Sequence, residues 1–275
     1  ESVGLPTYDQ EESDNFELGF KSPLPDMGMG SWTLATAGYF TKAKNVQLTS
    51  AVASPVGAIN SVATNQGEGE IKGIELDLSG FINDVISGGF TYAWTDPKFT
   101  KGCDPDEWTL TSGGGVFAND SGTDFTSVFP GSGPASCSIE GRRFPLTSEH
   151  QASAFVRLDF DGAGPFDSNF FVSSNVTYES SKFVQVHNRA ETGDATIVGA
   201  RFGFENDQWS LSAYGQNITN EDSIIMATRW LQTPYFIPAF SPNTAPLTAS
   251  RGAPRAFFGT LRKGAQFGAE LRVRF

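Results

Sequence analysis

The last nine residues of the chain alternate between apolar side chains and other residues. The apolar positions are Phe267, Ala269, Leu271, Val273 and Phe275, and Gly268, Glu270, Arg272 and Arg274 lie between them. Because side chains of a β-strand alternate between two faces, this pattern predicts a final strand with one apolar and one charged face. A strand with lipid on one side and a water-filled lumen on the other needs this arrangement.

Eight further segments show the same period of two. They cover residues 14–22, 32–48, 72–80, 85–95, 150–160, 170–178, 195–205 and 209–217, and no segment has a helical period. In residues 72–80, for example, three aliphatic side chains alternate with Glu75, Asp77 and Ser79. Together with the final strand, the pattern predicts nine strands and an all-β fold.

The connections between these segments alternate in length. Residues 22–31, 80–84, 161–168 and 205–208 are short connections, and residues 49–69, 96–149, 179–194 and 218–254 are long ones. Strict alternation places every long loop at the same end of the sheet, as in outer-membrane barrels. Aromatic residues near strand ends (Trp94, Tyr178, Trp209 and Phe275) fit an interfacial girdle.

The strand count predicts that the barrel is incomplete. Bacterial single-chain barrels have an even number of strands, and unpaired strand edges are costly in lipid. Nine strands therefore predict an antiparallel transmembrane β-barrel of which this chain is the carboxyl-terminal portion, with at least one strand supplied from elsewhere. The alternative is a tenth strand hidden in residues 32–66.

Composition and charge narrow the class of protein. The 275 residues carry a net charge of −12, which disfavours nucleic acid as a partner and electrostatic docking on anionic lipid. No run of 18 or more apolar residues is present, which excludes a transmembrane helix but leaves a transmembrane barrel open. The first residue is Glu1, so we expect either a removed leader or a piece of a longer protein.

Two cysteines lie in one long polar segment. Cys103 and Cys137 predict a disulfide that closes this loop in an oxidising compartment, and two free thiols are the alternative. No further cysteine is available for a thiolate metal site, so no metal is expected. The acidic run at 103–108 fits a solvated loop better than a site for a divalent cation.

Seven motifs, in order, resemble strands of the TonB-dependent outer-membrane receptors. They are SDNFELGFKS (13–22), GYFTKAKNVQ (38–47), GEIKGIELDLSG (69–80), GGFTYAWTDPKF (88–99), GRRFPLTSEHQAS (141–153), YGQNITNED (214–222) and PRAFFGTLR (254–262) with FGAELRVRF (267–275). The family has an amino-terminal plug and a TonB box before a barrel of about 22 strands. Neither is present here, so residues 1–275 resemble only the carboxyl-terminal barrel segment.

The resemblance implies a function in the bacterial outer membrane. It implies uptake of a scarce ligand such as a ferric siderophore, cobalamin or an oligosaccharide, with no enzymatic activity and no cofactor. The implied partners are the rest of the barrel and the plug, the TonB complex acting through the plug, outer-membrane lipid and the barrel-assembly machinery. Phe267, Leu271, Val273 and Phe275 would form the terminal assembly signal.

Candidate ligand contacts are aromatic or polar residues of the long loops. They are Trp108, Phe117, His187, Arg189, Arg229, Trp230, Tyr235 and Phe236. Aromatic rings stack on sugars and chelates, and arginine pairs with carboxylates. For any single one of them, packing of the loop against its neighbours is the more common role.

Other classes of function fit the sequence less well. Ser148 and His150 lie two residues apart on a strand, too far for a nucleophile and its base to form a hydrogen bond. A passive porin is an alternative within the barrel class. A secreted β-rich binding or adhesion module is the alternative outside it, although it leaves the one-sided long loops unexplained.

Overall fold

The computed structural model describes residues 8–25, 28, 30–53, 59–104, 138–188, 190–231 and 255–274. These residues form eleven β-strands: β1 (Glu12–Pro23), β2 (Ser31–Ala53), β3 (Ile59–Phe81), β4 (Ile86–Gly102), β5 (His150–Phe160), β6 (Asn169–Glu179), β7 (Ala195–Glu205), β8 (Trp209–Gln216), β9 (Ile224–Leu231), β10 (Arg255–Leu261) and β11 (Gln266–Val273). Within the described ranges, no helix has the length and apolar character needed to cross a membrane.

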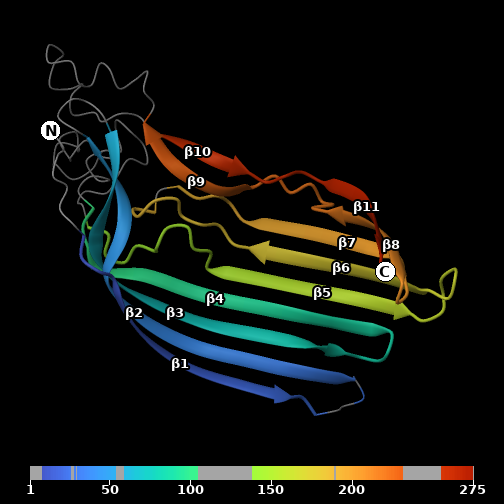
Figure 1. The fold of residues 1–275 in the computed structure, drawn as a ribbon. Coiled ribbons are helices and arrows are strands. Elements are labelled where there is room, and N and C mark those ends of the chain that lie inside the picture. Colours follow the sequence, from blue (N-terminus) through green and yellow to red (C-terminus); the bar gives the residue numbers. More distant parts are fainter. Residues whose placement is uncertain are drawn as a thin grey trace.

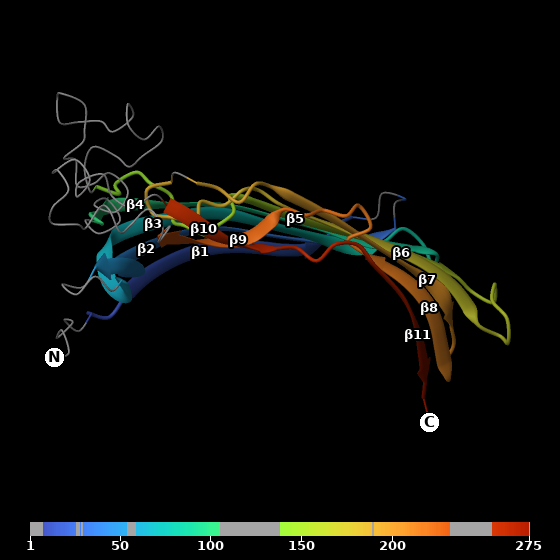
Figure 2. The same cartoon turned by 90° about the horizontal axis from the view of Figure 1, so that it is seen from above.

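Nine of the strands form a single antiparallel sheet. Its order is β1-β2-β3-β4-β5-β6-β7-β8-β11, so strands that follow one another in the sequence lie side by side up to β8 (Figure 1). The sheet is bent into an arch when it is viewed from above (Figure 2). Strands β1 and β11 are its two edges, so the described sheet is an open, curved wall. The predicted all-β, antiparallel fold is confirmed.

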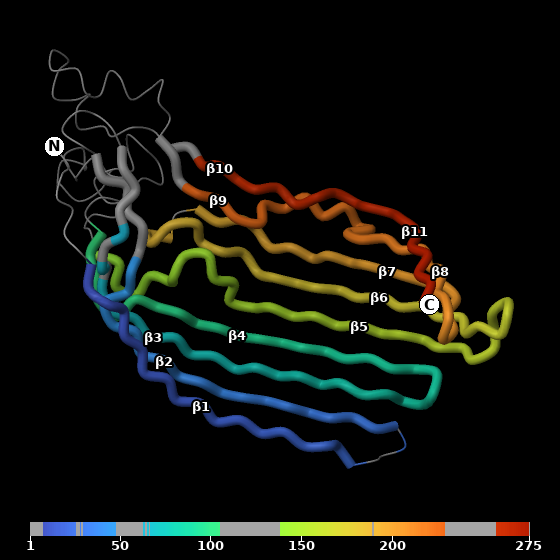
Figure 3. The backbone as a smooth tube through the Cα atoms, viewed as in Figure 1, coloured from blue at the N-terminus to red at the C-terminus, as the bar shows by residue number. Residues whose placement is uncertain are grey.

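The last two predicted strands are each interrupted. Strand β9 continues beyond β8, and β10 leads into β11 (Figure 3). Because β8 pairs with β11 and β9 pairs with β10, the four segments form one long broken hairpin. The chain therefore runs along the wall nine times, as the pattern predicts. The prediction of a single loop over 218–254 is wrong, because this region includes β9 and the loop ends where β10 begins.

The prediction that residues 49–69 form a loop is also wrong. Strands β2 and β3 contain 23 residues each and stay in register as far as the pair Ala53 and Ile59. This stretch is rich in small and hydroxyl-bearing residues, so its apolar alternation is too weak to identify a strand. The described part of 32–66 contains these two strands and no third one. Strand β4 likewise runs to Gly102, past its predicted end at Thr95.

The apolar faces of the strands are exposed. Phe16, Leu18 and Phe20 of β1 are 66%, 83% and 59% exposed, and the side chains of Phe267 and Leu271 of β11 are 74% and 67% exposed. A two-layer soluble sandwich would bury such side chains between its sheets. The buried apolar cluster lies instead at the loop end of the wall, where Ala43, Val46, Phe99, Ile139 and Val186 pack with Phe144.

Candidate functional site

Two rows of mostly polar side chains cross the middle strands. In the first row, Asp77, Thr91, Ser153, Thr177 and Ile197 are direct neighbours across β3 to β7. In the second row, one step closer to the loops, Glu75, Ala93, Gln151, Glu179 and Ala195 are neighbours in the same way. Residues two apart on a strand share a face, so both rows lie on one side of the sheet. We call these ten residues the inner wall.

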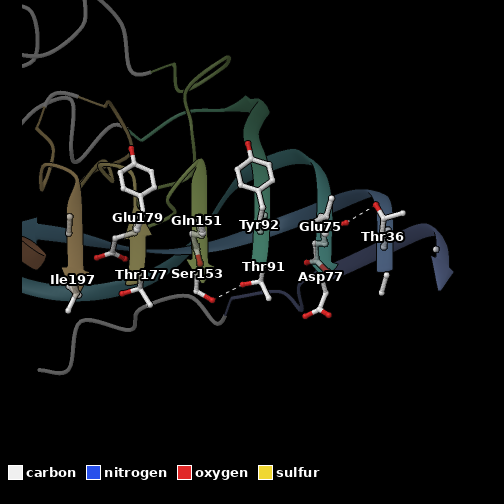
Figure 4. A pocket seen from close by; sticks show the side chains of 18 of the residues that line it. Thr36, Glu75, Asp77, Thr91, Tyr92, Gln151, Ser153, Thr177, Glu179 and Ile197 are labelled. Atoms are coloured by element: carbon white, nitrogen blue, oxygen red, sulfur yellow. Dashed lines mark hydrogen bonds between the residues drawn. The ribbon is translucent and has the colours of Figure 1, made fainter. Parts of the chain in front are cut away.

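The inner wall borders a hollow of about 730 Å³, to which Arg262 also contributes. Figure 4 shows Thr91, Ser153 and Thr177 pointing to one side of the sheet and Tyr92 to the other. The hydroxyl groups of Thr91 and Ser153 lie 2.8 Å apart and form a hydrogen bond. Hydroxyl, amide and carboxylate groups lie among alanine, leucine and isoleucine side chains in this lining, so it offers a partner both hydrogen-bonding groups and apolar contacts.

Ion pairs cover the inner face nearer the short turns. Arg157 lies 2.7 Å from Asp159 and 2.6 Å from Glu205, and its guanidinium lies 4.4 Å from the ring centre of Phe171. Arg201 and Arg272 both pair with Glu270, at 2.9 and 3.0 Å. The alternation in the final strand predicts a charged face that includes Glu270 and Arg272. No ion pair to another described residue involves Glu75 or Asp77 of the inner wall.

The base of the loop that follows β4 is fixed by its two ends. Backbone bridges join Lys98 to Arg143 and Cys103 to Ser138, and the N–H of Phe99 donates to the carbonyl of Arg142 over 2.9 Å. Cys103 is part of a disulfide. Its predicted partner Cys137 lies outside the described residues, so this pairing stays a prediction.

Two side chains join that loop to the segment that follows β6. Asn188 accepts the N–H of Arg143 at 2.7 Å and donates to its carbonyl at 2.9 Å, which imitates a strand pair. The hydroxyl oxygen of Ser180 accepts the N–H groups of Glu149 and His150, both at 3.0 Å. Neither residue can be recognised from the sequence, because an asparagine or a serine in a polar loop carries no local signal for such a role.

The groups considered for catalysis have other partners. Ser148 donates to the carbonyl of Ser180 at 2.9 Å, and Nδ1 of His150 lies 2.8 Å from the hydroxyl of Tyr92. In these contacts, the side chains of Ser148 and His150 do not form a hydrogen bond with each other. Over the described ranges, no group of three or more His, Cys, Asp or Glu side chains is placed to hold a metal ion.

The predicted ligand contacts are only partly within the described chain. Trp108, Phe117, Arg189, Tyr235, Phe236 and the terminal Phe275 lie outside the described residues. Arg229 and Trp230 lie on β9, opposite Phe257 and Ala256 of β10. His187 has an exposed fraction of 0%, which favours the packing alternative for this residue. Its contact with a ligand stays a prediction, as do the others.

Comparisons with known proteins agree with this architecture. Residues 2–218 match the family model described as TonB dependent receptor-like, beta-barrel. The ferric yersiniabactin uptake receptor FyuA from Yersinia pestis is similar in structure, with a TM-score of 0.61, 16% identity, and coverage of 98% of this chain and 32% of FyuA. The siderophore receptor PiuA from Acinetobacter baumannii is similar with a TM-score of 0.58 and 17% identity, and the match covers 96% of this chain and 29% of PiuA.

The copper transporter OprC gives a TM-score of 0.57 at 12% identity, with coverage of 98% of this chain and 33% of OprC. No curated protein matches the chain significantly. At these identities the structural likeness establishes the fold, and the chain spans about a third of the length of these solved receptors. The family match covers most of the chain, and the two-faced curved wall is the architecture of that family. The chain therefore belongs to the TonB-dependent receptor β-barrel family.

Proposed function

We propose that this chain forms part of the barrel wall of an outer-membrane receptor that takes up a scarce ligand with energy from TonB. The observation that carries the proposal is the separation of chemistry between the two faces of one open sheet. Exposed aromatic and aliphatic side chains cover one face, and hydroxyl groups, amides and ion pairs cover the other. Lipid and a polar lumen are the two environments that match these faces.

Each part of the wall has a role in this proposal. The apolar face contacts outer-membrane lipid, and the inner wall faces a plug domain that lies outside this chain. The long loops contribute ligand contacts, with Trp108, Phe117, His187, Arg189, Arg229, Trp230, Tyr235 and Phe236 as candidates. Phe267, Leu271 and Val273, exposed on the edge strand β11, are available to the barrel-assembly machinery, with Phe275 as the terminal residue.

We place a ferric siderophore first among the candidate ligands. FyuA is described as a ferric yersiniabactin uptake receptor, and PiuA as a siderophore receptor. Cobalamin and an oligosaccharide remain the other candidates, because the described inner wall offers hydrogen-bonding groups that suit all three.

Uptake by cells tests this proposal. Cells that carry the complete receptor and a chromosomal deletion of their other siderophore receptors are supplied with radiolabelled iron on a panel of siderophores. We expect accumulation with at least one siderophore and its loss when TonB is absent. Accumulation that does not depend on TonB would contradict the proposal.

Two measurements separate the alternatives. A passive porin predicts steady ionic conductance of the complete protein in a planar bilayer, whereas a plugged receptor predicts a closed bilayer. A secreted binding module predicts that the protein stays in the aqueous fraction, whereas a barrel wall requires detergent for extraction.

A further inference from the structure

The ribbon of β9 and β10 is structurally separate from the nine-stranded sheet. In the described chain these two strands pair only with each other. Strand β7 begins at Ala195, and Figure 1 shows that β9 and β10 extend farther toward the loop end of the sheet than the start of β7 does. A ribbon without neighbouring strands depends on a few contacts near its base for its orientation.

At the base of the ribbon, the strand is interrupted between β8 and β9 by a segment with defined hydrogen bonds. Asn217 and Asn220 have φ values of 50° and 55°, in the left-handed region that asparagine tolerates better than most residues. Nδ2 of Asn217 donates to the carbonyls of Glu221 and Lys263, both at 2.8 Å, and Oδ1 of Asn220 accepts the N–H of Ala265 at 3.0 Å. These bonds join the segment between β8 and β9 to the segment between β10 and β11. The two strands of the ribbon are therefore coupled as one unit.

Arg262, the residue after β10, connects this unit to the inner wall. Its guanidinium pairs with the carboxylate of Glu179 at the end of β6 and donates to the hydroxyl of Ser223 at 3.1 Å. Glu179 and Ala195 are direct neighbours on β6 and β7. Arg262 therefore reaches past β7, whose residue at this level is a small alanine that is 4% exposed.

The pair is shielded from solvent more than most ion pairs of the wall. The side chains of Arg262 and Glu179 are 14% and 27% exposed, and Lys182, also 14% exposed, pairs with the same carboxylate at 2.8 Å. By contrast, Arg272 on the edge strand is 62% exposed. A shielded pair is screened little by salt and is costly to break, because the charge of Arg262 then loses its ionic partner in a poorly hydrated place, while Glu179 keeps Lys182.

Two further hydrogen bonds join the segment after β8 to β7. The N–H of Ile218 donates to the carbonyl of Val198 at 2.9 Å, and the N–H of Thr196 lies 3.4 Å from the carboxylate of Glu221. Among the described residues, Glu179–Arg262 is the ion pair that links the ribbon to the main sheet.

We propose that the Glu179–Arg262 ion pair is a latch that fixes the angle of the β9–β10 ribbon relative to the inner wall. Arg262 acts as a positioning residue, and loss of the pair frees the ribbon while the nine-stranded sheet stays intact. Both partners also border the hollow over the inner wall. The latch therefore faces the space that an occupant of the lumen enters, and it is independent of which ligand the receptor takes up.

A distance measurement between two spin labels tests the latch in the complete protein. One label replaces Thr228 on β9, and the other replaces Asp161 in the turn after β5; both positions are exposed. We expect one narrow distance distribution in the unchanged protein and a broader, shifted one in Glu179→Gln and in Arg262→Gln. The matched control is Glu270→Gln, which breaks the Arg201 pair within the main sheet and should leave the distribution narrow.

The heat-dependent gel mobility of intact barrels shows whether each variant is folded. If one of the two single variants does not insert into the membrane, the other is sufficient for the test. The exchange variant Glu179→Arg with Arg262→Glu, combined with Lys182→Gln because Lys182 would otherwise repel the new arginine, should restore the narrow distribution. An unchanged distribution in a folded single variant overturns the latch. Broadening that the exchange does not reverse also overturns it, because packing of the arginine would then hold the ribbon.

Discussion

At the scale of single residues, aromatic rings on the polar face cover glycines of the paired strand. Tyr39 lies opposite Gly73, Phe155 opposite Gly89, and Tyr214 opposite Gly268, as three directly facing pairs. A Cβ at Gly73 would lie 2.2 Å from Cζ of Tyr39, and one at Gly268 would lie 2.6 Å from the hydroxyl of Tyr214. These glycines therefore leave room for a ring to lie flat across the strand pair.

We expect Gly73→Ala to destabilise the wall by about 1–3 kcal/mol, as overpacking does. The added methyl group displaces the ring of Tyr39, whose hydroxyl otherwise bonds to that of Thr95 over 2.9 Å. Gly38→Ala is the matched control on the same strand pair, because its Cβ would meet its nearest atom only at 4.0 Å. The free energy of unfolding in urea measures both variants. Equal losses in the two would show that the ring contact does not matter.

At the scale of elements, strand length and loop clamps divide the wall into two zones. Strands β5, β6 and β7 have 11 residues each, which is the length that a tilted strand needs to cross a bilayer. Beyond them, Asn188 and Ser180 clamp two connections together at the loop end. The clamp has its own small apolar cluster, so we expect it to open without unfolding the wall.

We expect Asn188→Ala to loosen residues 138–149 while the strands stay protected. The change removes two hydrogen bonds to Arg143 and strains a position with φ of 54°, for a combined local cost of roughly 1–3 kcal/mol. Asn188→Gly is the control, because it removes the bonds but accepts this φ. Amide hydrogen exchange reports the result. Protection that matches the unchanged protein in both variants would argue against the clamp.

At the scale of the whole molecule, the curved sheet has one apolar and one polar face. Val176 and Thr177 are consecutive residues of β6 that face opposite sides, the former 37% exposed on the apolar face and the latter at the inner wall. A charge on the lipid side has to be buried in hydrocarbon, whereas a charge at the inner wall borders the polar hollow.

This pair gives a direct test of orientation in the membrane. We expect Val176→Lys to destabilise the folded, inserted protein by about 2–4 kcal/mol if it lies near the bilayer midplane. Thr177→Lys should change stability by less than about 1 kcal/mol, because the hollow gives a lysine room and water. Folding into lipid vesicles across a urea series measures both. The reverse ranking would place lipid on the polar side and remove the basis for a receptor wall.

The sequence by itself determined the two faces, the antiparallel order and the nine passes. Alternation such as that of Phe267 to Val273 is a local property, because polarity at every second residue states which solvent each face meets. The tertiary structure alone decided the break between β8 and β9, the long β2–β3 hairpin and the contacts that fix the loop end. Glu179 and Arg262 are 83 residues apart, and Arg143 and Asn188 are 45 apart. Such pairs depend on the register of several intervening strands, which no local pattern in the chain records.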